Sequence, residues 1–263
     1  MEPAEGHRMI PHHVTDGDGE TVVLINSLGT TIDMWEPQVG PLSERFRVVR
    51  FDTRGHGRTP TPPGEWTVDD LAGDIIDLLD HLGARNAHLV GVSLGGATAM
   101  ALAEHYPDRV GRLALISAAT RIGTYDSWRD RATTVRANGC QAVSAGAMDR
   151  WFSPAFHRSH PETVAAFRER FDACDPEGYA GCCDAIGRMD LSGALGHVTA
   201  ETLIVVGTDD EVTTVADARF LAEGIRGSRL VPVPGGKHLL TAEFADLTNR
   251  LLVDFLTSSA ATA

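Results

Sequence analysis

The stretch "LVGVSLGGATAMALA" at residues 89–103 decides the fold of this 263-residue chain. An apolar run typical of a buried strand leads directly into a G-x-S-x-G pattern at 91–95, and a run of small residues typical of a helix follows. This context predicts a sharp strand-to-helix turn that holds Ser93 above the carboxyl end of the strand. Glycines are needed on both sides, because a Cβ there would collide with the neighbouring strand and helix. We therefore predict that Ser93 is a nucleophile; the alternative is a serine that only caps the helix.

Strand and helix patterns alternate along the rest of the chain. Nearly continuous apolar runs predict buried strands at 21–26, 47–52, 87–92, 112–117, 202–207 and 229–233. Helices are predicted at 67–83, about 95–106 and 243–257; the first begins with a capping box of Thr67 and Asp70. This order predicts an α/β fold with a mostly parallel central sheet flanked by helices.

The segment 122–197 interrupts the alternation. It has no strand pattern and concentrates the aromatic residues Trp128, Trp151, Phe152, Phe156, Phe167, Phe171 and Tyr179. We predict a helical cap inserted between two strands. The core domain then comprises residues 1–121 and 198–263.

Composition excludes several classes of partner. The formal net charge of −13 leaves no basic surface for a nucleic acid. No apolar run approaches the roughly 18 residues of a membrane-spanning helix, and the polar, acidic N-terminus does not resemble a secretory signal. We expect a cytoplasmic protein, and its oligomeric state does not follow from these features.

The cysteines and N-terminal histidines do not predict a metal centre. Cys140, Cys174, Cys182 and Cys183 have no C-x-x-C spacing, and adjacent cysteines cannot form an unstrained bridge, so reduced and packed thiols are expected. His7, His12 and His13 precede the first predicted strand, where histidines are more often solvated than metal-bound.

A nucleophilic serine requires a histidine base that is oriented by a carboxylate. On a sheet of this type the chain order is serine, acid, histidine. His238 follows the last predicted strand in a glycine loop, and the strand before it ends in Asp209, Asp210 and Glu211. We predict His238 as the base and Asp210 as the acid, with Asp209 as the alternative.

With these elements the sequence resembles the α/β-hydrolase fold family and, within it, the 3-oxoadipate enol-lactonases of the β-ketoadipate pathway. The resemblance lies in "NSLGTTIDMWEPQV" (26–39), "FRVVRFDTRGHGRT" (46–59), "GVSLGG" (91–96), "RWFSPAF" (150–156), "GYAGCCDAI" (178–186) and "GTDDEVTT" (207–214). The glycine-serine and "DTRGHG" elements are general to the fold. The "NSLG" and "RWF" elements are more specific to the lactonases.

The resemblance implies hydrolysis of a small, anionic lactone through an acyl-serine, without metal or organic cofactor. It also implies two backbone donors for the oxyanion, the N–H groups of Leu28 and Leu94. Asn26 and Ser27 are expected to hold the Leu28 loop through side-chain hydrogen bonds to nearby backbone.

The expected substrate pocket contains Trp151 from the cap, with Val212 and Leu239, which lie beside the predicted acid and base in the sequence. A substrate carboxylate requires an arginine, and Arg150 and Arg54 are both candidates. Lys237, the chain's only lysine, departs from the lactonase pattern; it would lower the basicity of His238 if it pointed inward, although a solvated side chain is the expectation.

The same scaffold also supports other functions. They are another small-ester or lactone hydrolase, a perhydrolase, a biosynthetic member of the fold, and a non-catalytic ligand-binding member.

Overall fold

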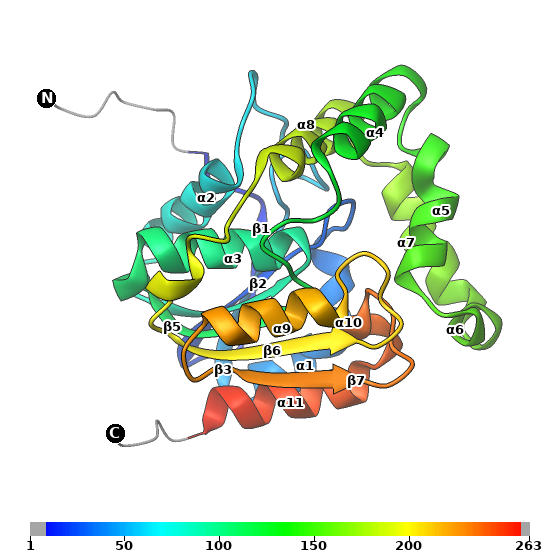
Figure 1. Cartoon of the computed structure of the whole chain (residues 1–263). Coiled ribbons are helices and arrows are strands. Elements are labelled where there is room, and N and C mark those ends of the chain that lie inside the picture. The colour runs from blue at the N-terminus through cyan, green and yellow to red at the C-terminus, as the bar shows by residue number, and fades with distance from the viewer. Residues whose placement is uncertain (1–8, 259–263) are drawn as a thin grey trace, which may run out of the picture.

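The computed structural model describes residues 9–258, and its centre is a seven-stranded sheet in the order β1-β3-β2-β4-β5-β6-β7 (Figure 1). The strands are β1 (His13–Asp16), β2 (Glu20–Ile25), β3 (Phe46–Phe51), β4 (Ala87–Val92), β5 (Val110–Ile116), β6 (Glu201–Gly207) and β7 (Arg229–Val233). Neighbouring strands are parallel, except that β1 pairs antiparallel with β3. The predicted mostly parallel sheet is confirmed. The sequence prediction missed β1, a short, half-exposed edge strand without an apolar run.

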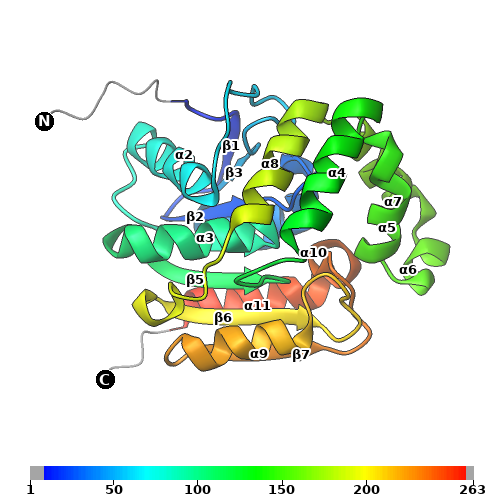
Figure 2. The same cartoon turned by 45° about the horizontal axis from the view of Figure 1, so that its top comes forward.

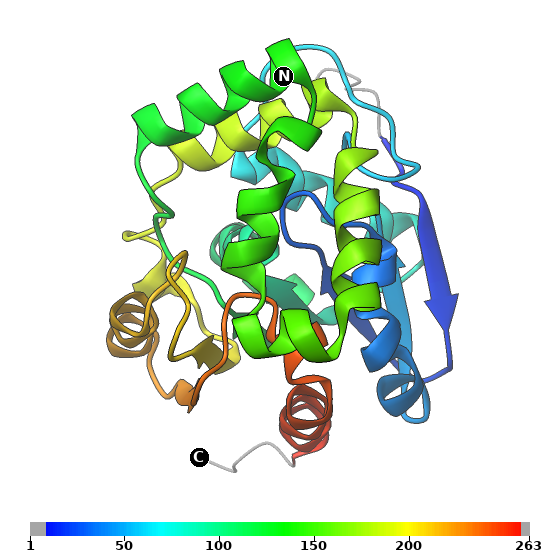
Figure 3. The ribbon, with the colours of Figure 1, turned by 90° about the vertical axis from the view of Figure 1, so that its right-hand side faces the viewer.

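Helices cover both faces of the sheet, as predicted. The helices α2 (Val68–His81), α3 (Leu94–His105) and α9 (Val215–Gly224) lie on one face, and α1 (Glu36–Ser43) and α11 (Ala245–Thr257) on the other (Figures 2 and 3). The predicted capping box of α2 is present, because the Thr67 and Asp70 side chains each accept the other residue's backbone N–H. The helix predicted at 243–257 is confirmed as α11, and the sequence prediction missed the short α10 (Leu240–Glu243) just before it.

Between β5 and β6 the chain forms helices and no strand, as the sequence pattern of 122–197 predicts. These helices, which we call the cap, are α4 (Tyr125–Asn138), α5 (Gln141–Trp151), α6 (Pro154–Ser159), α7 (Pro161–Asp172) and α8 (Pro176–Arg188). They lie beyond the carboxyl ends of the strands, and α4 and α8 run side by side (Figures 1 and 2). Aromatic rings pack the cap from within: Phe152 stacks on Phe156, and Trp151 meets Phe171 edge to face.

The strand order places two loops next to each other. Along the chain, β3 is added on one side of β2 and β4 on the other, so the direction of winding reverses at β2. Ile25 of β2 lies opposite Gly91 of β4 in this parallel pair. The loop after β2 and the turn after β4 therefore leave the sheet side by side, at the switch point where doubly wound sheets bind their ligands.

The glycines around Ser93 allow a very close approach of helix and strand. A Cβ on Gly91 would overlap the carbonyl oxygen of Gly95, and a Cβ on Gly95 would overlap the carbonyl oxygen of Ile25. The start of α3 is therefore pressed directly against the ends of β4 and β2. This confirms the prediction that a side chain at position 91 or 95 would collide with the neighbouring strand and helix.

The structure buries the cysteines and gives hydrogen-bond partners to two of the N-terminal histidines. The four cysteines are free and buried, as predicted. The His12 ring hydrogen-bonds to Asp52, the His13 ring bonds to a backbone carbonyl, and His7 lies outside the described residues. Residues 9–258 contain no cluster of three or more potential metal ligands. No helix in the same range is long and apolar enough to span a bilayer.

The close approach at Gly95 generates a stability prediction. Because an alanine Cβ would collide with the β2 backbone, we expect Gly95→Ala to lower the free energy of unfolding by about 3 kcal/mol or more. Gly73→Ala, inside α2 with open space around the new Cβ, should instead be neutral or stabilising by up to about 1 kcal/mol. Urea unfolding of both variants measures the difference, and equal midpoints would show that the contact is not a constraint.

Candidate active site

Ser93 stands between β4 and α3 in a backbone conformation that is rare for a residue with a side chain. Its φ and ψ are 57° and −115°, and it is one of two non-glycine residues with positive φ among residues 9–258. The Ser93 side chain makes no capping hydrogen bond to α3. This observation argues against the alternative that Ser93 only caps the helix. The strained backbone of this turn exposes the Ser93 hydroxyl, as a nucleophile elbow does.

His238 and Asp210 form a buried pair at the carboxyl ends of β7 and β6. The His238 Nδ1–H donates to Asp210 Oδ2 over 2.8 Å, and the two residues are 2% and 5% exposed. The other Asp210 oxygen accepts the N–H groups of Val212 and Thr213, and the Thr213 hydroxyl donates to Oδ2. With Nδ1 protonated, the free acceptor of the imidazole is Nε2.

The surroundings of Asp210 keep it ionised. Burial by itself raises the pKa of this carboxyl, but the charge of His238 and the hydrogen bonds from His238, Thr213 and Val212 outweigh it, so that the pKa is lowered. Asp209 and Glu211 are exposed; Asp209 accepts a bond from the Thr208 hydroxyl, and Glu211 lies 4.0 Å from Lys237 Nζ. Among the three acids that follow β6, only Asp210 is bonded to the histidine within the described residues.

A small cavity of about 40 Å³ unites most of the residues predicted from the sequence. It is lined by Ser27, Leu28, Ser93, Trp128, Arg131, Arg150, Trp151, Tyr179, Val212 and His238. Leu239 does not line it; this residue is fully buried, and its N–H donates to the Trp151 carbonyl. Trp128, Arg131 and Tyr179 were not predicted as site residues, because they lie in cap helices without a motif.

The loop after β2 fixes the direction of the Leu28 N–H. The Ser27 carbonyl accepts the backbone N–H of Thr30 at 3.2 Å and its hydroxyl at 2.7 Å. Because a trans peptide is planar, the Leu28 N–H points away from that carbonyl. Neither Leu28 N–H nor Leu94 N–H has a hydrogen-bond acceptor among residues 9–258. Two backbone donors thus stand unused beside the Ser93 turn.

Asn26 and Ser27 hold this loop in different ways. Asn26 Nδ2 donates to the Phe51 carbonyl at 2.8 Å and its Oδ1 accepts the Trp35 indole N–H at 2.9 Å, which confirms the predicted role of its side chain. Ser27 acts through its backbone: besides the carbonyl, its N–H donates to Met34 Sδ. The expectation of a bond from the Ser27 side chain is not met within the described residues.

Lys237 connects the histidine loop to the cap. Its Nζ donates to the Asp149 carbonyl at 2.9 Å, so the cation is directed at the end of α5. The Leu239 N–H bond to the Trp151 carbonyl makes a second connection at the same place. The cap segment that carries Trp151 is therefore tied to both neighbours of His238.

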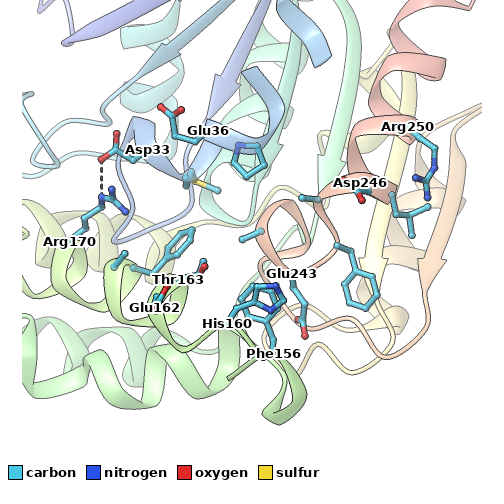
Figure 4. Close-up of a pocket in the computed structure, with 18 residues that line it drawn as sticks. Asp33, Glu36, Phe156, His160, Glu162, Thr163, Arg170, Glu243, Asp246 and Arg250 are labelled. Atoms are coloured by element: carbon cyan, nitrogen blue, oxygen red, sulfur yellow. Dashed lines mark ion pairs between the residues drawn. The ribbon is translucent and has the colours of Figure 1, made fainter. Parts of the chain in front are cut away.

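Among the described residues a larger hollow lies elsewhere, between the cap helices α6 and α7 and the core helices α10 and α11 (Figure 4). Its volume is about 810 Å³, and the ion pair of Arg170 with Asp33, 2.8 Å long, lies at one end of its lining. Neither Ser93 nor His238 lines it. The chemistry of the small cavity, and not the size of the hollow, identifies the candidate active site.

The arginines considered for a substrate carboxylate differ in their surroundings. Arg54 Nε and Nη2 donate to the two oxygens of Asp74, both at 2.6 Å, so this side chain is already neutralised. Arg150 and Arg131 both line the small cavity, and neither forms an ion pair with a carboxylate of residues 9–258. Burial and the neighbouring charge of Arg131 lower the pKa of Arg150.

His56, in the turn after β3, holds the Leu28 loop through a hydrogen bond to its backbone. Its Nε2 accepts the Gly29 N–H at 3.1 Å, and its Nδ1–H donates to the Arg54 carbonyl at 3.2 Å. Burial lowers the pKa of His56, against the smaller opposing effects of the Arg54 carbonyl and of the charges of Asp52 and Asp175. The ring is thus held in its neutral form.

Comparison with known proteins matches the chain to one fold family. The profile of the alpha/beta hydrolase fold family matches residues 20–244. The chain is 38% identical to 3-oxoadipate enol-lactonase 2 of Acinetobacter baylyi, over 83% of each protein. It is 32% identical to a putative carbamate hydrolase of Variovorax paradoxus, over 91% of this chain and 92% of that protein. The crystal structure of the enol-lactonase from Burkholderia xenovorans superposes with a TM-score of 0.92 at 39% identity, covering 94% of this chain and 96% of that one.

The Asp210–His238 hydrogen bond predicts which of the neighbouring carboxylates the reaction requires. Asp210→Asn would present an amide that no longer selects the Nδ1–H tautomer, so we expect kcat for p-nitrophenyl acetate to fall about 10³- to 10⁴-fold. Asp209→Asn, the matched control on the exposed neighbour, should stay within about twofold of the wild type, as a surface change does. The reverse order of effects would reassign the acid to Asp209.

Buried, neutral His56 predicts an acid sensitivity of folding. Its pKa in the folded protein lies below the ordinary 6.5, so below that pH the unfolded chain binds more protons and the free energy of unfolding falls as the pH falls. Relative to His56→Gln, the wild type should lose up to about 1.4 kcal/mol per pH unit between pH 6.5 and 5. Urea unfolding at several pH values measures this, and parallel pH profiles would contradict it.

Proposed function

The chain belongs to the α/β hydrolase fold family, and on that basis we propose that it is a serine hydrolase that opens the lactone ring of 3-oxoadipate enol-lactone. The relatives support the general activity, hydrolysis of an ester or lactone. The specific substrate, its place in the breakdown of aromatic compounds and the catalytic roles below are our proposal. Four free, buried thiols are compatible with the expected cytoplasmic location.

In the first half of the reaction His238 Nε2 takes the proton of Ser93 as Oγ attacks the lactone carbonyl carbon. Asp210 keeps the imidazole in the required tautomer and stabilises the imidazolium that forms. The Leu28 and Leu94 N–H groups donate to the oxygen that becomes negative. When the tetrahedral intermediate collapses, the ring C–O bond breaks and the enol oxygen leaves with the proton from His238.

In the second half the acyl-serine is hydrolysed. His238 accepts a proton from water, the hydroxide attacks the acyl carbon, and the proton returns to Ser93 Oγ as the C–O bond breaks. The released enol converts to a ketone, which makes ring closure unfavourable. Of the groups used in these steps, Ser93, His238 and Leu28 line the small cavity, Leu94 follows Ser93 in the chain, and Asp210 is bonded to His238.

The observation that carries the choice of substrate is the pair of unneutralised arginines in that cavity. Arg131 Nε donates to the Tyr179 hydroxyl at 2.7 Å. The two outer nitrogens of its guanidinium have no carboxylate partner among residues 9–258. Arg150 has no hydrogen bond within the described residues. The Arg131 guanidinium lies over the rings of Trp128 and Tyr179, and its charge repels that of Arg150, so an anion that joins the two half-buried cations would be favourable. A lactone that carries a free carboxylate supplies that anion while its ring reaches Ser93.

The size of the cavity implies movement on binding. About 40 Å³ is room for a few water molecules and too little for a lactone with a carboxylate arm. Cap side chains therefore have to rearrange around the substrate. Trp151 is held at its backbone by the Leu239 N–H, so we expect the rearrangement in side chains of α4 and α8.

The test compares 3-oxoadipate enol-lactone with neutral esters, a neutral lactone and a carbamate. We expect the anionic lactone to be the best substrate, and Ser93→Ala to abolish its turnover. Arg150→Met should raise KM for the anionic lactone about 10- to 100-fold, the worth of one charged hydrogen bond, and leave p-nitrophenyl acetate unchanged. Arg129→Gln, an exposed arginine of α4, is the matched control.

Other outcomes decide between the rival functions. Good turnover of neutral esters or of the carbamate, without turnover of the anionic lactone, would reject the proposed substrate and keep the serine mechanism. Equal loss for charged and neutral substrates in Arg150→Met would reject the anion site. Full activity of Ser93→Ala would reject the mechanism.

A further inference from the structure

We propose that His56 is a positioning residue for the reaction: by accepting the Gly29 N–H it holds the loop that presents the Leu28 N–H to the oxyanion. The inference rests on the proposed serine hydrolase mechanism. His56 does not line the catalytic cavity, so it would act through the loop and not on the substrate.

The loop is fixed at two successive peptides. The peptide that contains the Leu28 N–H is held at its other end, where Thr30 donates twice to the Ser27 carbonyl. The next peptide, which contains the Gly29 N–H, is held by His56 Nε2. Because each peptide is planar, these bonds together determine the orientation of the Leu28 N–H.

Gly29 cannot easily find another arrangement. Its φ is +77°, which disfavours a side chain, and a Cβ there would press on the rings of Phe171 and Tyr179. Gly29 is buried, so its N–H has no access to water if the histidine acceptor is removed. An unpaired buried N–H is costly, and the loop would move to relieve it.

The ring of His56 is itself firmly oriented. The Arg54 carbonyl can only accept, so Nδ1 carries the hydrogen and Nε2 presents its lone pair to Gly29. Arg54 is anchored by its two bonds to Asp74. The turn at 52–57 makes a second connection to the loop, because Asp52 Oδ1 accepts the Ile32 N–H at 2.9 Å.

Loss of the acceptor should therefore affect the step in which negative charge develops, and not substrate binding. We expect His56→Leu, which has similar bulk and no acceptor, to lower kcat about 10- to 100-fold with KM within about twofold. His56→Gln places an amide oxygen near the position of Nε2 and should recover activity to within about threefold of the wild type. His56→Asn keeps a donor for the Arg54 carbonyl but is too short to reach Gly29, so it should behave like His56→Leu.

The experiment measures three quantities in the wild type and the three variants: the rate at which a fluorophosphonate labels Ser93, and kcat and KM for p-nitrophenyl acetate. Neither probe needs the natural lactone. Circular dichroism shows whether each variant is folded, and if His56→Leu does not fold, the comparison is made between His56→Asn and His56→Gln.

The outcomes separate this inference from the proposed function. Slow labelling in the leucine or asparagine variant, with recovery in the glutamine variant, supports the positioning role. Wild-type rates in His56→Asn, equal losses in all folded variants, or a loss confined to KM would overturn it while leaving the serine mechanism intact. Failure of the wild type itself to label at Ser93 would overturn both.

Discussion

The close approach of α3 to the end of β2 at Gly95 is the constraint on which the site depends. It brings the strained Ser93 turn beside the loop after β2, at the point where the winding of the sheet reverses. Next to this contact, neither the first N–H of α3 nor the Leu28 N–H has an acceptor among residues 9–258. A side chain at position 95 would separate the two loops, and the proposed oxyanion donors with them.

The charges around this arrangement are paired, with one exception. Asp210 is hydrogen-bonded to His238, and Arg54 is paired with Asp74, while burial keeps His56 uncharged. The cations of Arg131 and Arg150 have no carboxylate partner among the described residues. Because protein interiors rarely hold unpaired charge, this exception supports the proposal that an anionic substrate pairs with the two arginines. Leu28, which supplies one of the proposed oxyanion donors, lines the same cavity as these two arginines.

Local patterns in the sequence predicted the parallel strands, the capping box at Thr67 and the glycine-flanked turn at Ser93, because each depends on neighbouring residues. The edge strand β1 was missed because only four half-exposed residues form it. Arg131 and His56 were missed as site residues for a different reason. Arg131 meets Tyr179 across 48 residues and His56 meets Gly29 across 27, and no local pattern encodes such contacts. Leu239 was predicted in the pocket from its place beside His238, yet its backbone instead ties the histidine loop to the cap.

The central claim is that two backbone N–H groups, one from each of these loops, receive the charge that develops when Ser93 attacks. The most direct measurement is a crystal structure of the protein after its serine has been phosphonylated, since the adduct imitates the tetrahedral intermediate. We expect phosphorus bonded to Ser93 Oγ and the phosphoryl oxygen about 2.7–3.1 Å from both Leu28 N and Leu94 N. A phosphoryl oxygen that points to solvent or to other donors, or a label on another residue, would contradict the claim.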